Sequence, residues 1–176
     1  MVCQRVVRSV LRQLLINPPV GYRVEPVYFH DVKGFCYARR FKELFMDNQV
    51  DYTFDDPISF SSDDIFLGLD LSAALFPACN KHLSFMKSTG VDIFYVVYDL
   101  TPLQDNNWHH PEMRRCFERW IKGITEFSSG LVCISDTVAQ DTKDYIRKNL
   151  SHIPENIKVS HFHLGADIKN SVPTFL

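Results

Sequence analysis

The sequence predicts a folded chain of the α/β class with an open, mostly parallel, Rossmann-like sheet, and the order of its apolar segments together with its composition predicts this. Short apolar runs bounded by polar residues recur along the chain, as strands buried on both faces do. Amphipathic stretches of helical length separate these runs. Hydrophobic residues make up 45% of the chain and charged residues 23%, as in ordinary globular proteins. Strands that alternate with helices imply βαβ units, with helices on both faces of one sheet.

The first third of the chain is predicted to begin with a helix. Apolar residues recur at helical spacing over 6–15, with arginines between them, and Asn17-Pro18-Pro19 ends the pattern. Residues 22–29 alternate in polarity and predict a strand. A short strand or turn followed by a helix is expected over 34–46. Residues 47–64 are rich in Asp, Ser and Pro and predict a surface loop.

The rest of the chain has a regular order of strand and helix. Pro111 suits the first turn of a helix, and Ser135 is the expected N-cap of the last helix. The alternation over this region is the strongest evidence for the fold class. Strands are predicted at 65–69, 91–98, 131–134 and 157–163, and helices at 72–88, from 111 onward and at 136–148.

Composition and charge exclude several kinds of partner. A formal net charge of -2 gives no long-range field that would gather nucleic acid. No apolar run approaches the ~20 residues that span a bilayer, and the first apolar stretch is broken by arginines, unlike a signal peptide. We therefore expect a cytoplasmic protein whose membrane contact is at most peripheral.

The five cysteines and seven glycines exclude further classes of site. The cysteines are widely spaced and form no C-x-x-C pair, so we expect small core residues of a reducing compartment, not disulfides or a zinc site. The chain contains no G-x-S-x-G nucleophile elbow, no Walker-type phosphate loop and no G-x-G-x-x-G fingerprint. A stand-alone hydrolase is the weakest hypothesis, because no nucleophile–base pair stands at a recognisable spacing.

Polar residues follow each predicted strand of the parallel sheet. Ligands of such sheets bind at the carboxyl ends of the strands. Each residue taken alone is as readily explained as a turn former or a helix cap. Parallel strands, however, bring all of them to one edge. The residues are Asp70 after the first strand, Tyr98 and Asp99 after the second, Ser135 after the third, and Gly165 with Asp167 after the fourth.

Two further features belong to this edge. Ser135 and Asp136 open a helix, where free N–H groups and the helix dipole favour a phosphate; a plain N-cap is the alternative. The loop after Asp99 carries Trp108, His109 and His110. Adjacent histidines point apart and no further Cys or His stands at ligand spacing, so we predict no metal and expect contact with an acceptor sugar instead.

His161 and His163 alternate on the last predicted strand and therefore point the same way. For both residues, packing in the core or at an interface is the default interpretation.

Four motifs in a fixed order resemble a known family. These are Val96–Leu103 (VVYDLTPL), the helix that contains Trp120, Leu131–Ala139 (LVCISDTVA) and Phe162–Asp167 (FHLGAD). Together they resemble family 4 GT-B glycosyltransferases, particularly the mannosyltransferases of bacterial O-antigen and related polysaccharide synthesis. Two earlier segments, Gln4–Leu15 followed by Asn17-Pro18-Pro19 and then Gly21–Tyr28, are similar to the first helix and second strand of that group.

The resemblance implies how such a chain would work. In these enzymes two Rossmann-like domains face a cleft: the first positions the acceptor glycan, and the second holds a sugar nucleotide such as GDP-mannose. They retain anomeric configuration without a bound metal. By this resemblance Asp99 and Tyr98 line the acceptor side, although many relatives have His where Tyr98 stands. Ser135 would lie near the donor phosphates, and Gly165–Asp167 would lead into the interdomain hinge.

The chain departs from the family pattern at both ends. Relatives begin with a strand before the helix that matches Gln4–Leu15, and that first strand is missing here; Leu176 comes just past the hinge. We therefore expect residues 1–176 to form a single acceptor-side domain that lacks the donor-binding domain and does not transfer sugar alone. Its expected partners are a glycan acceptor and either a separate donor-binding domain or another copy bound through exposed sheet edges. A non-catalytic glycan-binding module or a gene remnant is the alternative.

Overall fold

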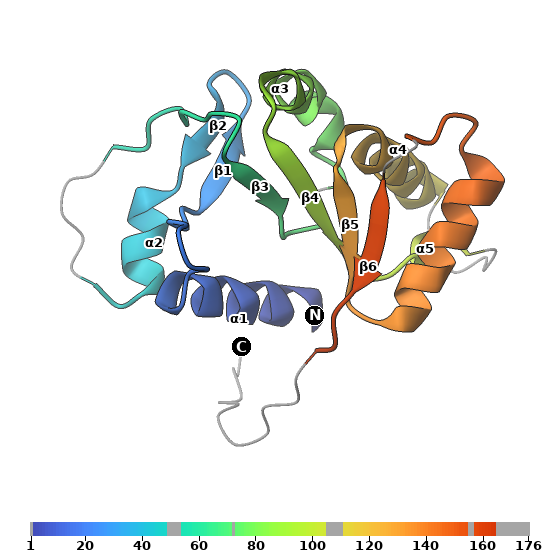
Figure 1. Ribbon diagram of the computed structural model, residues 1–176, viewed down its shortest axis with the longest axis horizontal. Helices are drawn as coiled ribbons and strands as arrows, with labels where there is room; N and C mark the ends of the chain where they lie inside the picture. The colour runs from blue at the N-terminus through green and yellow to red at the C-terminus, as the bar shows by residue number, and fades with distance from the viewer. Residues whose placement is uncertain (1, 49–53, 72, 105–110, 155–156, 165–176) are drawn as a thin grey trace.

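The computed structural model describes residues 2–48, 54–71, 73–104, 111–154 and 157–164 (Figure 1). Its elements, in chain order, are α1 (Val2–Ile16), β1 (Val27–His30), β2 (Gly34–Tyr37), α2 (Arg39–Phe45), β3 (Ile65–Gly68), α3 (Phe76–Thr89), β4 (Asp92–Val97), the 3-10 helix η1 (Thr101–Leu103), α4 (Pro111–Phe127), β5 (Gly130–Cys133), α5 (Asp136–Asn149) and β6 (Lys158–His161).

The main sheet has the strand order β3-β4-β5-β6, and all three pairings are parallel. The register places Tyr95 of β4 beside Leu131 of β5, and Val97 beside Cys133. Helices connect the strands and flank the sheet (Figure 1). The predicted α/β class with a parallel, Rossmann-like sheet is confirmed.

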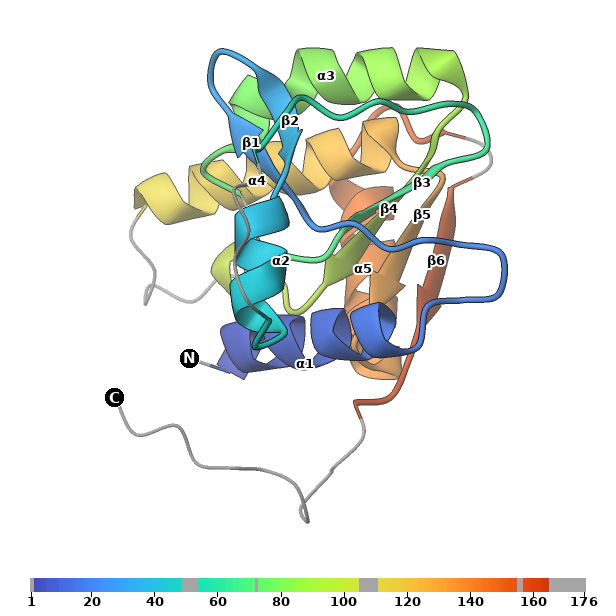
Figure 2. The same ribbon diagram turned by 90° about the vertical axis from the view of Figure 1, so that its left-hand side faces the viewer.

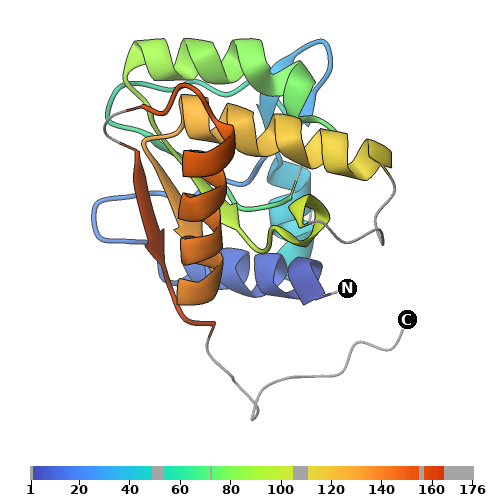
Figure 3. The ribbon, with the colours of Figure 1, turned by 90° about the vertical axis from the view of Figure 1, so that its right-hand side faces the viewer.

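Three helices pack against one face of this sheet. The ring of Phe76 on α3 lies 6.2 Å from that of Tyr95, and the thiol of Cys133 lies 3.7 Å from the hydroxyl of Thr142 on α5. Because Tyr95 and Cys133 point to the same face, α3 and α5 share that face, and α4 lies between them (Figure 3). The main hydrophobic core forms in this layer.

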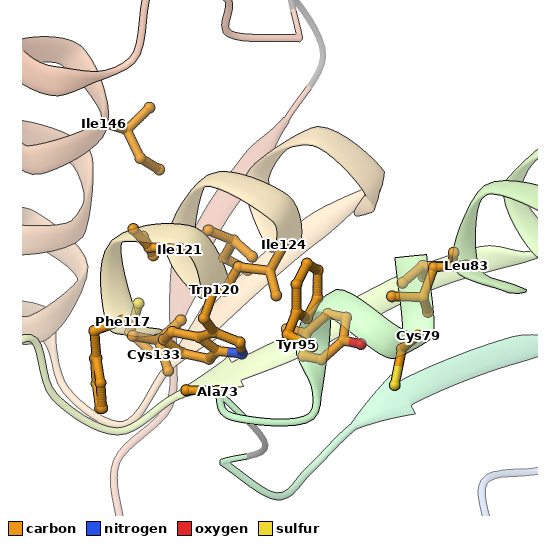
Figure 4. Close-up of a cluster of buried hydrophobic side chains, with 14 of the residues drawn as sticks. Ala73, Cys79, Leu83, Tyr95, Phe117, Trp120, Ile121, Ile124, Cys133 and Ile146 are labelled. Atoms are coloured by element: carbon orange, nitrogen blue, oxygen red, sulfur yellow. The ribbon is translucent and has the colours of Figure 1, made fainter. Parts of the chain in front are cut away.

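Helix α4 supplies the centre of the core. Trp120, Ile121 and Ile124 are fully buried and face the sheet (Figure 4). On the same helix Gly123 lets α3 approach closely, because a Cβ atom at this position would lie 1.9 Å from the ring of Phe76. Helices α3 and α4 therefore pack closely at this point.

A separate β1–β2 hairpin packs beside β3, and it corrects the strand predicted over 22–29. Only Val27–His30 forms a strand, and it pairs antiparallel with Gly34–Tyr37. Pro26 lacks an N–H group for a sheet, although its carbonyl accepts a hydrogen bond from Ala38. The hairpin packs through Phe35, whose ring lies 5.0 Å from that of Phe66 on β3.

Helix α1 forms as predicted but joins the core only weakly. It lies across the carboxyl ends of the strands (Figures 1 and 2). Its contacts include a hydrogen bond from Arg12 to the carbonyl of Phe45, at 3.4 Å, and the guanidinium of Arg8 over the Phe45 ring. Its apolar stripe is only half-buried. These stripe residues are Val6, Val7, Val10, Leu11, Leu14 and Leu15.

The start of α5 agrees with the prediction, and the start of α3 is later than predicted. Helix α5 begins at Asp136 with Ser135 as its N-cap, as predicted. Helix α3 begins at Phe76, four residues later than the prediction from 72, with Pro77 in its first turn where proline is favoured. It ends at Gly90, whose φ of 94° is a left-handed value that suits glycine.

Candidate site at the carboxyl edge of the sheet

The predicted polar residues that the structure describes do meet at one edge. Asp70, Asp99 and Ser135 each follow a strand of the parallel sheet, and those strands lie side by side in the order β3, β4, β5. Asp70 and Asp99 are exposed and Ser135 is half-buried. This edge therefore presents two carboxylates and the start of a helix, as the sequence predicted.

Tyr98 lies at the same edge, but its side chain is directed inward. It is 6% exposed, and its hydroxyl donates a hydrogen bond to the carbonyl of Leu69 at 2.8 Å. The phenol thereby joins the loop after β4 to the loop after β3. In this geometry Tyr98 positions the two loops that carry Asp99 and Asp70, and its predicted contact with an acceptor stays a prediction.

The two exposed carboxylates are held by their own loops. Asp99 accepts a hydrogen bond from the N–H of Thr101 at 3.1 Å, at the start of η1. Asp70 accepts one from the N–H of Leu71 at 2.8 Å. Such short-range bonds are typical of turn-forming aspartates, and they also fix the carboxylate orientation. The structure thus supports the turn-forming interpretation and leaves both groups accessible to a ligand.

Ser135 caps helix α5 with its side chain. Its hydroxyl oxygen accepts a hydrogen bond from the N–H of Val138 at 3.2 Å. This contact confirms the N-cap interpretation. The same helix start presents backbone N–H groups toward the carboxyl edge, where the helix dipole favours an anion. Binding of a donor phosphate there stays a prediction.

Two histidines, His161 and His163, also lie at this edge, although they were not among the predicted site residues. The Nδ1 atom of His161 lies 3.5 Å from a carboxylate oxygen of Asp136, and the rings of His161 and His163 meet edge to face at 5.3 Å. The alternation of the two histidines indicated that they share a face. Cys133 of β5 is in register with His161 of β6, which brings the two histidines to the first turn of α5. Their contact with α5 follows from the order of the strands in the sheet, which the alternation alone does not give.

Several predicted site residues lie outside the described residues. They are Trp108, His109, His110, Gly165 and Asp167. Within the described part of the chain no group of three or more His, Cys, Asp or Glu side chains could hold a metal ion.

The cysteines behave as core residues where the structure describes their side chains. Cys36, Cys79 and Cys133 are buried free thiols, and Cys116 is half-buried. Burial, together with the nearby Asp31 carboxylate, raises the pKa of Cys79 from 9.0 to about 11. Burial also raises the pKa of Cys133. A thiol that resists ionisation is a poor nucleophile, so these cysteines serve packing.

Two hollows on the surface of the described residues involve helix α4. One lies along the outer face of α4, lined by Arg115, Arg119 and Lys122 among others. The other lies between α3 and α4 and includes Pro77 and Asn80. Neither hollow includes Asp70, Asp99 or Ser135. None of the described helices is long and apolar enough to cross a bilayer.

Comparisons with known proteins show what the whole chain is similar to. No protein-family model matches the chain, and no solved structure matches it. Curated relatives do: two serotype-specific mannosyltransferases WbdA of Escherichia coli are 37% and 36% identical to it over 173 residues, which is 97% of this chain. The chain spans about a fifth of the length of these relatives, 21% in each case. The chain is therefore homologous to a segment that makes up about one fifth of each WbdA mannosyltransferase. This homology confirms the resemblance to mannosyltransferases that the ordered motifs predicted.

Proposed function

We propose that this chain is the acceptor-binding part of a retaining GT-B mannosyltransferase of bacterial surface polysaccharide synthesis, such as O-antigen. In this proposal it holds the acceptor glycan at the carboxyl edge, and a donor-binding domain supplies a sugar nucleotide such as GDP-mannose. The single observation that carries the proposal is the meeting of Asp70, Asp99 and the capped start of α5 at one edge of a mannosyltransferase-like chain.

Asp99 is the residue proposed to act at the reacting hydroxyl. In mannosyl transfer the acceptor oxygen forms a bond to C1 of mannose, the bond from C1 to the diphosphate breaks, and the hydroxyl proton passes to an oxygen of the departing diphosphate. An exposed carboxylate with a fixed orientation can accept a hydrogen bond from that hydroxyl and hold it for attack. Asp70, on the neighbouring loop, can accept a hydrogen bond from another hydroxyl of the same sugar.

The start of α5 is proposed to serve the leaving group. A diphosphate gains negative charge as the sugar leaves, and backbone N–H groups at a helix start stabilise such charge. Ser135 keeps this helix start ordered through its bond to Val138. His161, next to Asp136, would add positive charge there when it is protonated.

Transfer is proposed to need a second domain. Asp70 and Asp99 are exposed, so a diphosphate bound beside them stays in contact with water, where hydrogen bonds and charges stabilise a transition state far less than in an enclosed site. A donor-binding domain across the edge would exclude water and bring the remaining phosphate contacts. We further propose that the chain works at the cytoplasmic face of the inner membrane, with peripheral contact only.

Binding of the acceptor tests the proposal without any donor domain. A mannose-containing oligosaccharide would be titrated into isotope-labelled protein, and backbone amide shifts would be followed by NMR. We expect shifts centred on Asp70 and Asp99. Asp99→Asn keeps an oxygen that can accept from Thr101 but loses the charge, and should weaken binding at least fivefold.

Asp141→Asn is the matched control, because this exposed aspartate lies within α5, beyond the first turn of the helix. It should bind like the unmodified chain. Shifts absent from the carboxyl edge, or an Asp99→Asn variant that binds with unchanged affinity, would contradict the proposal. Shifts at the edge with no transfer under any condition would favour a glycan-binding module.

A further inference from the structure

Three basic side chains form a stripe on the exposed face of helix α4. This cationic stripe consists of Arg115, Arg119 and Lys122, which are all exposed. Their spacings of four and three residues place them next to one another along the helix surface. All three line the hollow on the outer face of α4. The cationic stripe is thus a local concentration of positive charge on a chain whose formal net charge is -2.

The charge of the cationic stripe is not neutralised by neighbouring carboxylates. Within the described part of the chain, none of its three side chains forms an ion pair. Glu118 lines the same hollow but is paired with Arg114 at 3.0 Å. The guanidinium of Arg119 donates to the carbonyl of Arg115 at 3.3 Å and to the thiol of Cys116 at 3.4 Å. Like charges at these spacings repel each other, so a bound anion would relieve that repulsion.

Two carboxylates mark the ends of the cationic stripe. Glu112 lies three residues before Arg115, Glu126 lies four residues after Lys122, and both are exposed. At 1.5 Å per residue, the distance along the helix from Arg115 to Lys122 is about 10 Å. A nucleic acid or a long acidic segment would extend past these ends and meet like charges, which oppose its binding. The cationic stripe therefore favours a compact anion.

The hollow between α3 and α4 adds a hydrogen-bond donor from a second helix. It has a volume of about 260 Å³, shares Arg119 and Lys122 with the hollow on the outer face, and is also lined by Asn80 and Glu126. The side-chain oxygen of Asn80 is buried and has no hydrogen-bond partner among the described residues. The part of this amide left to face a ligand is therefore its NH₂ group, which is a donor. Pockets for drug-sized ligands hold roughly 300 to 1,000 Å³, so this hollow suits a small group.

We propose that the cationic stripe and the hollow beside it form a binding site for a compact phosphate group with two or more negative charges, as in a phosphate monoester or a diphosphate. Phosphate oxygens accept several hydrogen bonds at once, and a guanidinium offers them a planar pair of donors. Arg119 and Lys122 would contact the group from α4, and Asn80 would contact it from α3. The residues proposed to serve sugar transfer line neither hollow, so this site stands or falls independently of that function.

Titration with inorganic pyrophosphate tests the proposal. The whole chain is labelled with ¹⁵N, and its amide signals are followed by NMR at constant ionic strength. We expect saturable shifts at the backbone amide of Lys122 and at the side-chain amide of Asn80. Pyrophosphate should bind at least fivefold more tightly than sulfate, because it carries more charge. Shifts that centre on the start of α5 instead, or that grow without saturating, would contradict the proposal.

Vesicles distinguish a free phosphate from one that a lipid carries. Sedimentation of the chain with phosphatidylcholine vesicles is measured with and without phosphatidic acid, which is a lipid phosphate monoester. Binding to the phosphatidic acid vesicles that pyrophosphate competes away would assign the site to a lipid phosphate. Pyrophosphate binding without vesicle binding would assign it to a soluble phosphate or diphosphate. Absence of both kinds of binding would overturn the proposal.

Two variants and a matched control test the named contacts. Lys122→Gln removes a charge that both hollows share and should weaken pyrophosphate binding at least fivefold. Lys148→Gln removes the same charge from an exposed position in the last turn of α5 and should bind like the unmodified chain. Asn80→Leu removes the donor together with the unpaired oxygen, so it should weaken binding at least threefold without lowering the midpoint of thermal unfolding. Equal binding by Lys122→Gln and Lys148→Gln would overturn the proposal.

Discussion

The hydroxyl of Tyr98 donates a hydrogen bond to the main-chain carbonyl of Leu69, 2.8 Å away. This contact joins the ends of two neighbouring parallel strands, β4 and β3, at the edge where Asp99 and Asp70 are exposed. The hydrogen bond therefore helps to hold the two loops that carry these carboxylates in place.

Tyr98→Phe should therefore destabilise the chain. The variant loses the hydrogen bond to the carbonyl of the half-buried Leu69, which costs about 1 kcal/mol. Urea denaturation followed by far-UV circular dichroism measures the change. Tyr22→Phe, at a residue that is 49% exposed, is the control and should change the free energy of unfolding little. Equal stability of Tyr98→Phe and the unmodified chain would contradict this role.

Gly123→Ala should destabilise the packing of α3 on α4. The added methyl group would lie 1.9 Å from a carbon of the Phe76 ring, so the ring or the helices must shift. Overpacking of this kind costs about 1 to 3 kcal/mol. The midpoint of thermal unfolding should fall, whereas the exposed neighbour Lys122→Ala should leave it nearly unchanged. A Gly123→Ala variant with an unchanged midpoint would show that α3 and α4 pack less closely than described.

Ser135→Ala should weaken the start of α5. Loss of the hydroxyl removes the acceptor for the Val138 N–H, and loss of an N-cap typically costs about 1 kcal/mol. Amide exchange in the first turn of α5 should become faster, and the free energy of unfolding should fall. Thr137→Ala, an exposed substitution in the same turn, serves as the control. Similar effects from both substitutions would argue against a capping role.

Stability should fall at alkaline pH through Cys79. Its pKa is raised from 9.0 to about 11 by burial and the Asp31 carboxylate, so the folded thiol keeps its proton where the unfolded thiol loses it. Unfolding then releases protons, and the contribution is complete below about pH 9 and is lost as pH rises toward 11. The free energy of unfolding between these pH values should fall less steeply in Cys79→Ala. Parallel slopes in the two proteins would contradict the assignment.

The elements that the sequence predicted best have strong local signals. The strands at β4 and β5 are continuous apolar runs, and Ser135 and Pro111 mark helix starts with side chains suited to those positions. The strand predicted over 22–29 is shorter because Pro26 interrupts the ladder and Gly34, with φ 77°, turns the chain into a hairpin. The pairing of β1 with β2 depends on which segment lies beside β1, and the pattern of polar and apolar residues does not show this.

The sequence predicted where in the fold the candidate site lies, but not most of the contacts between its residues. Asp70 and Asp99 were found because parallel strands bring their carboxyl ends together. The inward direction of Tyr98 and the contact between His161 and Asp136 depend on strand order and register, which the sequence did not specify. The hollow between α3 and α4 likewise became visible only with the packing of the two helices.

Sugar transfer by this chain should require a separate donor-binding domain. The chain would be incubated with GDP-mannose and a mannosyl acceptor, alone and together with a separately expressed donor-binding domain of a WbdA-type relative, and the mannosylated product would be measured. We expect product in the mixture only, abolished by Asp99→Ala and retained in Asp141→Ala. Product formed by the chain alone, or by the mixture with Asp99→Ala, would contradict this expectation.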